Sequence, residues 1–158
     1  MKILMVCLGN ICRSPLAEGI LKEKLSVAGV NWQVESAGTN GYHTGEPPHL
    51  LSQKVAEKNG IDISDQRSRK FVKNDLLEFD IIYAMANDVM NDIQSISRGD
   101  FNEKKVVLFL NELYPGQHLD VPDPWSGPEK GYHEVYELIS RACDAIIENH
   151  LITTKQIS

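Results

Sequence analysis

The fold of this chain is decided by residues 7–15, CLGNICRSP. The preceding run from Lys2 to Val6 is short and mostly apolar, which predicts a buried strand. From Pro15 to about residue 28 the apolar residues take up helical spacing with proline in the first turn, which predicts a helix. A strand, a tight loop and a helix N-terminus therefore follow one another at the start of the chain.

This loop has the composition of a phosphate-binding site. Backbone N–H groups at a helix start bind oxyanions, and we expect Gly9 to permit the strained turn that this requires. Cys7 would lie beneath the phosphorus as the nucleophile, and Arg13 would bind two phosphate oxygens in bidentate fashion. A free cysteine thiol is mostly protonated at neutral pH, so the loop amides, Arg13 and Ser14 would together stabilise the thiolate. The alternative, a core cysteine beside an unrelated surface arginine, does not explain this combination of residues.

Two segments resemble the low-molecular-weight protein tyrosine phosphatases. Residues 6–15, with Ala17 and Glu18, are similar to the family's signature, and residues 121–125, VPDPW, are similar to its general-acid loop. The resemblance spans nearly the whole chain and implies that residues 1–158 form a single domain of this family. It also implies a flavodoxin-like fold, a phosphocysteine intermediate, and hydrolysis of phosphotyrosine and aryl phosphomonoesters without a metal or other cofactor. The phosphate-binding residues would be Leu8, Gly9, Asn10, Ile11, Cys12 and Ser14.

The candidate general acid and base is Asp123. A carboxylic acid can protonate the leaving oxygen and then accept a proton from the attacking water. Pro122 and Pro124 restrict the backbone on both sides of it. Taken alone, this segment is typical of a surface turn, and only the family resemblance favours catalysis. Asp120, outside the Asp-Pro pair, is the weaker candidate.

The resemblance also implies residues that support the loop and residues that select the substrate. Asn10 would hold the loop shape with Ser36 as its partner. Tyr42 and Trp125 would line a deep slot that favours a phosphotyrosine ring over shorter side chains. The chain departs from the family pattern at Gln66, where a histidine is common, and at Ala86, near a common aspartate. A second aromatic residue is also replaced, by Ser126.

Three cysteines, an odd number, indicate free thiols and a reducing compartment. Cys12 is either a buried small apolar residue or a resolving thiol that forms a disulfide with an oxidised Cys7. Cys143 has the apolar surroundings of a core residue. The five histidines lack metal-ligand spacing, and we expect no metal site.

Composition limits the class of partner. A net charge of -6 argues against nucleic acid and anionic membranes as general partners. No stretch is long enough to cross a bilayer, and a strand that begins at Lys2 leaves no room for a signal peptide. We therefore expect a cytoplasmic enzyme whose partners are phosphotyrosine proteins and a cognate tyrosine kinase. The oligomeric state is not predicted.

Strand and helix patterns alternate along the chain. We expect strands at 2–6, 33–37, 79–85 and 105–110, and helices at 15–28, 48–59, 87–96 and 131–150, with Gly60 ending the second helix. The fold class is therefore α/β, a doubly wound, four-stranded parallel sheet with helices on both faces. Ligands of such sheets bind at the carboxyl ends of the strands, where Cys7 lies.

Three other functions remain to be weighed. Arsenate reductases of this fold need a downstream cysteine pair near the third strand, where this chain has Tyr83-Ala84-Met85. Arginine phosphatases resemble the same loop with threonine in place of Ile11. A phosphate-binding or redox-sensing module without turnover would not need Asp123.

Overall fold

The computed structural model describes residues 1–157, with side chains for residues 1–151. Its centre is a four-stranded parallel sheet in the order β2-β1-β3-β4. The strands are β1 (Lys2–Cys7), β2 (Gln33–Gly38), β3 (Ile81–Ala84) and β4 (Val106–Leu108). This order places β1 in the interior of the sheet, as in flavodoxin-like folds, and confirms the predicted fold class.

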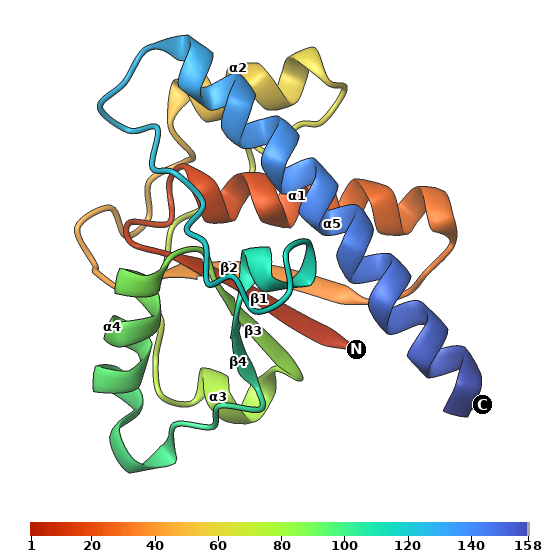
Figure 1. Cartoon of the computed structure of the whole chain (residues 1–158). Helices are drawn as coiled ribbons and strands as arrows, with labels where there is room; N and C mark the ends of the chain where they lie inside the picture. Colours follow the sequence, from red (N-terminus) through yellow and green to blue (C-terminus); the bar gives the residue numbers. More distant parts are fainter. Residues whose placement is uncertain (158) are drawn as a thin grey trace.

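Helices cover both faces of the sheet (Figure 1). On one face lie α1 (Arg13–Ala28) and the long α5 (Glu129–Ile157), with α2 (Leu50–Lys58) packed beside them. On the other face lie α4 (Asn87–Ser97) and the single-turn α3 (Asp75–Glu78). Alternate residues of β1 point to opposite faces, so Met5 joins the core of α1 and α5 while Val6 joins that of α4. A strand buried on both sides needs an apolar residue at each position, which explains the run that opens the chain.

Several predicted boundaries are wrong. The strands predicted at 79–85 and 105–110 are shorter, because Phe79, Met85 and Phe109 are buried without being strand residues. Phe109–Glu112 instead forms a 3-10 turn, and α3 and a second 3-10 turn at Arg98–Asp100 were not predicted. The last helix is longer than expected at both ends. Gly60 follows α2 with a φ of 79°, in agreement with its predicted role.

Candidate active site

The loop between β1 and α1 is held from outside through its carbonyl groups. These carbonyls accept hydrogen bonds of 2.8 to 3.4 Å from Thr39 N, Asn40 N, His49 N, Ser52 Oγ and Ser68 Oγ. A trans peptide places its N–H opposite its C=O, so the N–H groups of the loop are turned to the inner side. There, the N–H of Asn10 donates to the Cys7 sulfur at 3.3 Å. The result is a concave row of donors around a cysteine sulfur, which suits an oxyanion.

The strained residue of this loop is Asn10 and not Gly9. Asn10 has a φ of 58°, whereas Gly9 is absent from the positive-φ residues of the described chain, so our expectation for Gly9 is wrong. Asparagine adopts this region more readily than most residues. Gly9 provides space instead, since a Cβ there would lie 3.1 Å from His43 Cδ2. Gly38, a residue missed in the sequence, is also required, because a Cβ there would lie 2.8 Å from the Leu8 carbonyl oxygen.

A hydrogen-bond network lies under the loop. Ser14 Oγ is 3.0 Å from the Cys7 sulfur, and Asn10 Nδ2 lies 2.7 Å from Ser14 Oγ and 3.0 Å from Ser36 Oγ. Asn10 Oδ1 accepts a hydrogen bond from Arg69 N at 3.1 Å. The structure therefore brings Asn10, Ser14 and Ser36 together with the sulfur.

The next member of this network is Glu18, which belongs to the matched signature but was given no role in the sequence analysis. Ser36 Oγ donates to the buried carboxylate of Glu18 at 2.7 Å. The available signal was a glutamate among the apolar residues of α1. Gln66, at the position expected for a supporting residue, instead donates to the Pro15 carbonyl at 3.1 Å. Ala86 is buried immediately before α4.

Arg13 and Asp123 meet at the side of the loop. The buried Arg13 guanidinium donates to the Val121 carbonyl at 3.0 Å, and its second nitrogen lies 3.7 Å from Asp123 Oδ2. Asp123 remains half exposed, and its Oδ1 accepts from Trp125 N at 3.1 Å. Asp120 is directed elsewhere, because its Oδ1 accepts from both the backbone and side-chain nitrogens of Asn87 at 2.7 Å.

These groups border one cleft of about 280 Å³. Its lining is Cys7, Leu8, Gly9, Ile11, Cys12, Arg13, Asn40, Tyr42, His43, Asp123 and Trp125. Tyr42 is 86% exposed, whereas Trp125 is 49% exposed and lies between two imidazoles, with ring centroids 5.5 Å from His43 and 5.3 Å from His49. His43, which follows Tyr42 in the same loop, also lines the cleft, and its Nδ1 is 2.8 Å from Glu46 Oε2.

Both remaining cysteines are buried free thiols. Cys12 lines the cleft, and its sulfur is 3.7 Å from the Tyr132 hydroxyl. Burial raises the pKa of the Cys12 thiol to about 11, so this thiol is protonated at neutral pH. Cys143 lies in the core between α5 and α1, in agreement with the prediction, and burial raises its pKa further.

Among the residues whose side chains are described, no three His, Cys, Asp or Glu residues gather as a metal site. No helix within the described chain combines the length and the apolar character needed to cross a membrane.

Comparisons with known proteins agree on one family. Residues 2–156 match the family model described as low molecular weight phosphotyrosine protein phosphatase. The human low molecular weight phosphotyrosine protein phosphatase is 34% identical over 92% of this chain and 93% of its own length. A protein tyrosine phosphatase from Entamoeba histolytica, solved with Hepes in its active site, superposes with a TM-score of 0.89 at 33% identity, covering 98% of this chain and 99% of that one. Vibrio vulnificus Wzb, solved with benzylphosphonate, has a TM-score of 0.83 at 28% identity, covering 94% and 97% of the two chains.

Proposed function

The chain belongs to the low molecular weight phosphotyrosine protein phosphatase family, and from that premise we propose that Cys7, Arg13 and Asp123 carry out its reaction. The protein is a protein-tyrosine phosphatase, a hydrolase that acts through a phosphocysteine intermediate. What the family membership leaves to be assigned is the role of each residue in this chain.

In the first step, the Cys7 thiolate attacks phosphorus in line with the leaving oxygen. The sulfur–phosphorus bond forms as the phosphorus–oxygen bond to tyrosine breaks, and Asp123 gives its proton to the departing phenolic oxygen. Arg13 and the inward N–H groups bind the equatorial oxygens, where charge is concentrated in the transition state. Arg13 is already positioned for this by its bond to the Val121 carbonyl.

In the second step, water attacks the phosphocysteine. Asp123, now ionised, accepts a proton from this water, and inorganic phosphate leaves as the sulfur–phosphorus bond breaks. The leaving sulfur regains negative charge, which the Ser14 hydroxyl stabilises from 3.0 Å. Asp123 is open to solvent, so a water molecule has access to it.

The observation that supports this assignment is the convergence of Cys7, Arg13 and Asp123 on one cleft, from segments at opposite ends of the chain. The test is to quench the reaction with a phosphotyrosine peptide in acid and to search for phosphate on Cys7 by peptide mass spectrometry. We expect phosphate on Cys7 in the native protein, at the native level in a Cys12→Ser control, and no phosphate at position 7 in Cys7→Ser. Rapid turnover without phosphate on Cys7 would contradict the assignment.

We also propose that the substrates are phosphotyrosine proteins of the cytoplasm and that one of them is a cognate tyrosine kinase. The free thiols support a reducing compartment. The experiment is substrate trapping with Cys7→Ser in the parent cell, with Cys7→Ser/Arg13→Ala as a matched control that lacks the phosphate ligand. Proteins captured equally by both variants are not substrates.

A further inference from the structure

We propose that Glu18, paired with Lys22, is a positioning residue that aligns the hydrogen-bond chain leading to the Cys7 sulfur. The chain runs from the Glu18 carboxylate through Ser36, Asn10 and Ser14, with separations of 2.7, 3.0, 2.7 and 3.0 Å. The inference rests on the proposed role of Cys7 as nucleophile. It adds Glu18, which follows Arg13 on α1 by about 1.4 turns and is linked to the sulfur only through these hydrogen bonds.

The direction of each hydrogen bond follows from which atoms can donate. The N–H of Arg69 can only donate, so the Asn10 atom that it contacts is the amide oxygen. The amide nitrogen of Asn10 therefore faces Ser14 and Ser36 and donates one hydrogen to each hydroxyl oxygen. The assignment of this amide is thus determined by a backbone group, which has no alternative orientation.

Each hydroxyl then has its own hydrogen left to donate. Ser14 donates to the Cys7 sulfur, and Ser36 donates to Glu18 Oε1. The series of hydrogen bonds consequently ends at two acceptors, the Cys7 thiolate under the phosphate site and the Glu18 carboxylate on α1. Asn10 lies between them and distributes its two hydrogens, so the position of Asn10 depends on both ends.

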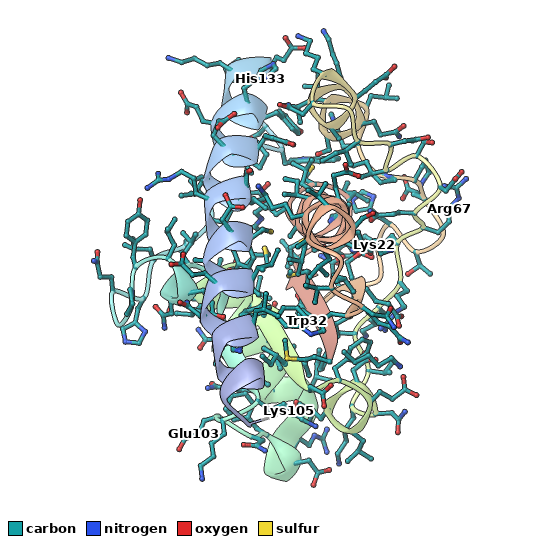
Figure 2. All side chains as sticks on the ribbon, turned by 90° about the vertical axis from the view of Figure 1, so that its right-hand side faces the viewer. Lys22, Trp32, Arg67, Glu103, Lys105 and His133 are labelled. Atoms are coloured by element: carbon teal, nitrogen blue, oxygen red, sulfur yellow. The ribbon has the colours of Figure 1, made fainter. Side chains whose placement is uncertain are left out.

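A carboxylate at position 18 meets two demands at once. Oε1 accepts from Ser36, while Oε2 accepts from the Lys22 ammonium at 2.6 Å. Figure 2 shows Lys22 on the side of α1 turned away from α5, and its side chain is half exposed while that of Glu18 is buried. Glutamine has one acceptor oxygen and cannot satisfy both donors. If that oxygen faces Lys22, the buried Ser36 hydroxyl loses its acceptor, and Ser36 and Asn10 shift away from their native positions.

The experiment measures the rate at which iodoacetamide alkylates Cys7 as a function of pH, with the site of alkylation read by peptide mass spectrometry. This readout follows the thiolate and needs no turnover. For Glu18→Gln we expect the midpoint to rise by about one pH unit, and kcat for an aryl phosphate to fall roughly tenfold with KM little changed. Lys22→Met and the exposed-carboxylate control Glu23→Gln should match the native protein.

The decisive variant is Glu18→Gln/Lys22→Met. With the ammonium removed, the amide oxygen is free to accept from Ser36, so the midpoint and kcat should return close to the native values. A native midpoint in Glu18→Gln, or a double variant that stays impaired or does not fold, overturns the proposal. If Glu18→Gln itself does not fold, the double variant carries the test alone. An unchanged alkylation profile with normal hydrolysis rejects Glu18 as a positioning residue and leaves the proposed function intact, whereas loss of the phosphocysteine intermediate rejects the function.

Discussion

Cys7 at the floor of the cleft is 3% exposed, and distant segments bond to the outer side of its loop, whereas Tyr42 at the rim is 86% exposed. In the proposed function the floor binds the phosphate group, which is the same in all phosphomonoesters. Because this group does not vary, one fixed loop conformation is sufficient, and the buried hydrogen bonds to the loop stabilise that conformation. The walls must distinguish what is attached to the phosphate, and they present aromatic faces to solvent. This difference indicates that changes to the floor will affect all substrates alike, and changes to the walls will affect them unequally.

The largest expected effect is at the floor. Cys7→Ser removes the nucleophile and Arg13→Ala removes the bidentate ligand, so each should reduce hydrolysis to background for aryl and alkyl phosphates alike. The measurement is steady-state turnover of p-nitrophenyl phosphate and a phosphotyrosine peptide. Thermal unfolding of each variant serves as the folding control. Appreciable turnover by Cys7→Ser would exclude the covalent route.

Asp123 lies between the floor and the walls of the cleft. The loss of activity on its removal should depend on how much the leaving group of the substrate needs protonation. We expect Asp123→Ala to lower kcat for phosphotyrosine by roughly 10²- to 10⁴-fold, and less for p-nitrophenyl phosphate, whose leaving group needs protonation less. Asp120→Ala is the matched control, since Asp120 bonds to Asn87. Equal losses on both substrates would remove Asp123 from the role of acid.

Variants of the cleft walls should affect aryl and alkyl phosphates unequally, unlike variants of the floor. Trp125→Ala and Tyr42→Ala should each lower kcat/KM for phosphotyrosine peptides roughly tenfold and spare small alkyl phosphates, because ring contacts are lost. The two variants also differ from each other. The Trp125 ring contacts His43 and His49, so we expect Trp125→Ala to disturb the acid loop as well; Tyr42 is 86% exposed, and we expect no such effect from Tyr42→Ala. Equal losses on aryl and alkyl phosphates would assign these rings to loop structure and place specificity elsewhere.

Substitution of Cys12 tests whether this thiol protects Cys7 from irreversible oxidation. We expect Cys12→Ser to retain basal turnover and to change the response to mild peroxide from reversible to slow, irreversible loss. In the native protein the Cys12 thiol would attack the sulfenic acid of Cys7, releasing water and forming a disulfide that thiol reductants reopen. Because the pKa of Cys12 is raised to about 11, disulfide formation should accelerate from pH 7 to pH 9. Peptide mapping that finds both thiols free, or bonded elsewhere, contradicts this role.

The smallest expected effect is on stability, and it concerns the pair Glu112 and His150, which do not line the cleft. Burial alone would raise the pKa of Glu112, but hydrogen bonds with His150 and Tyr83 outweigh it and lower that pKa, while Glu112 raises the pKa of His150. A raised His150 pKa contributes stability below the unfolded value near 6.5 that is lost as pH rises through the folded value. The lowered Glu112 pKa contributes stability above the unfolded value near 4.5 that is lost as pH falls. His150→Ala should therefore lower Tm by about 2–4 °C near pH 5.5 and by less at pH 9, with kcat unchanged. A Tm decrease that does not vary with pH would contradict this pairing.

The sequence predicted well what is local. The strand, loop and helix from Lys2 to Ala28 are encoded by adjacent residues, and their apolar patterns and turn residues are sufficient. Strand ends were predicted poorly because burial and strand geometry are separate properties. Phe79 and Phe109 are buried by packing against neighbouring elements, and an apolar pattern does not reveal which backbone conformation brings them there.

The lining of the cleft was predictable where a residue belongs to a motif with a proposed chemical role, and its supporting contacts were not. Cys7, Arg13 and Asp123 belong to recognisable motifs and line one cleft. Gly38 and Glu18 act through a close approach and a hydrogen bond to residues that are distant in sequence. Such contacts depend on the register of β2 against β1 and on the rotation of α1, which no single-residue pattern specifies.

The hydrogen bonds on the outer side of the loop have a consequence for protein synthesis. Their donors lie in residues 39–68, and the carbonyl that positions Arg13 belongs to Val121. Translation proceeds from the N-terminus, so Cys7 leaves the ribosome long before these partners exist. A nascent chain therefore carries an ordinary cysteine, and the reactive thiolate arises only once most of the polypeptide has been made and folded. Ribosome-bound chains that end before residue 121 should react with iodoacetamide at the rate of a free cysteine, and the released full chain should react faster at neutral pH.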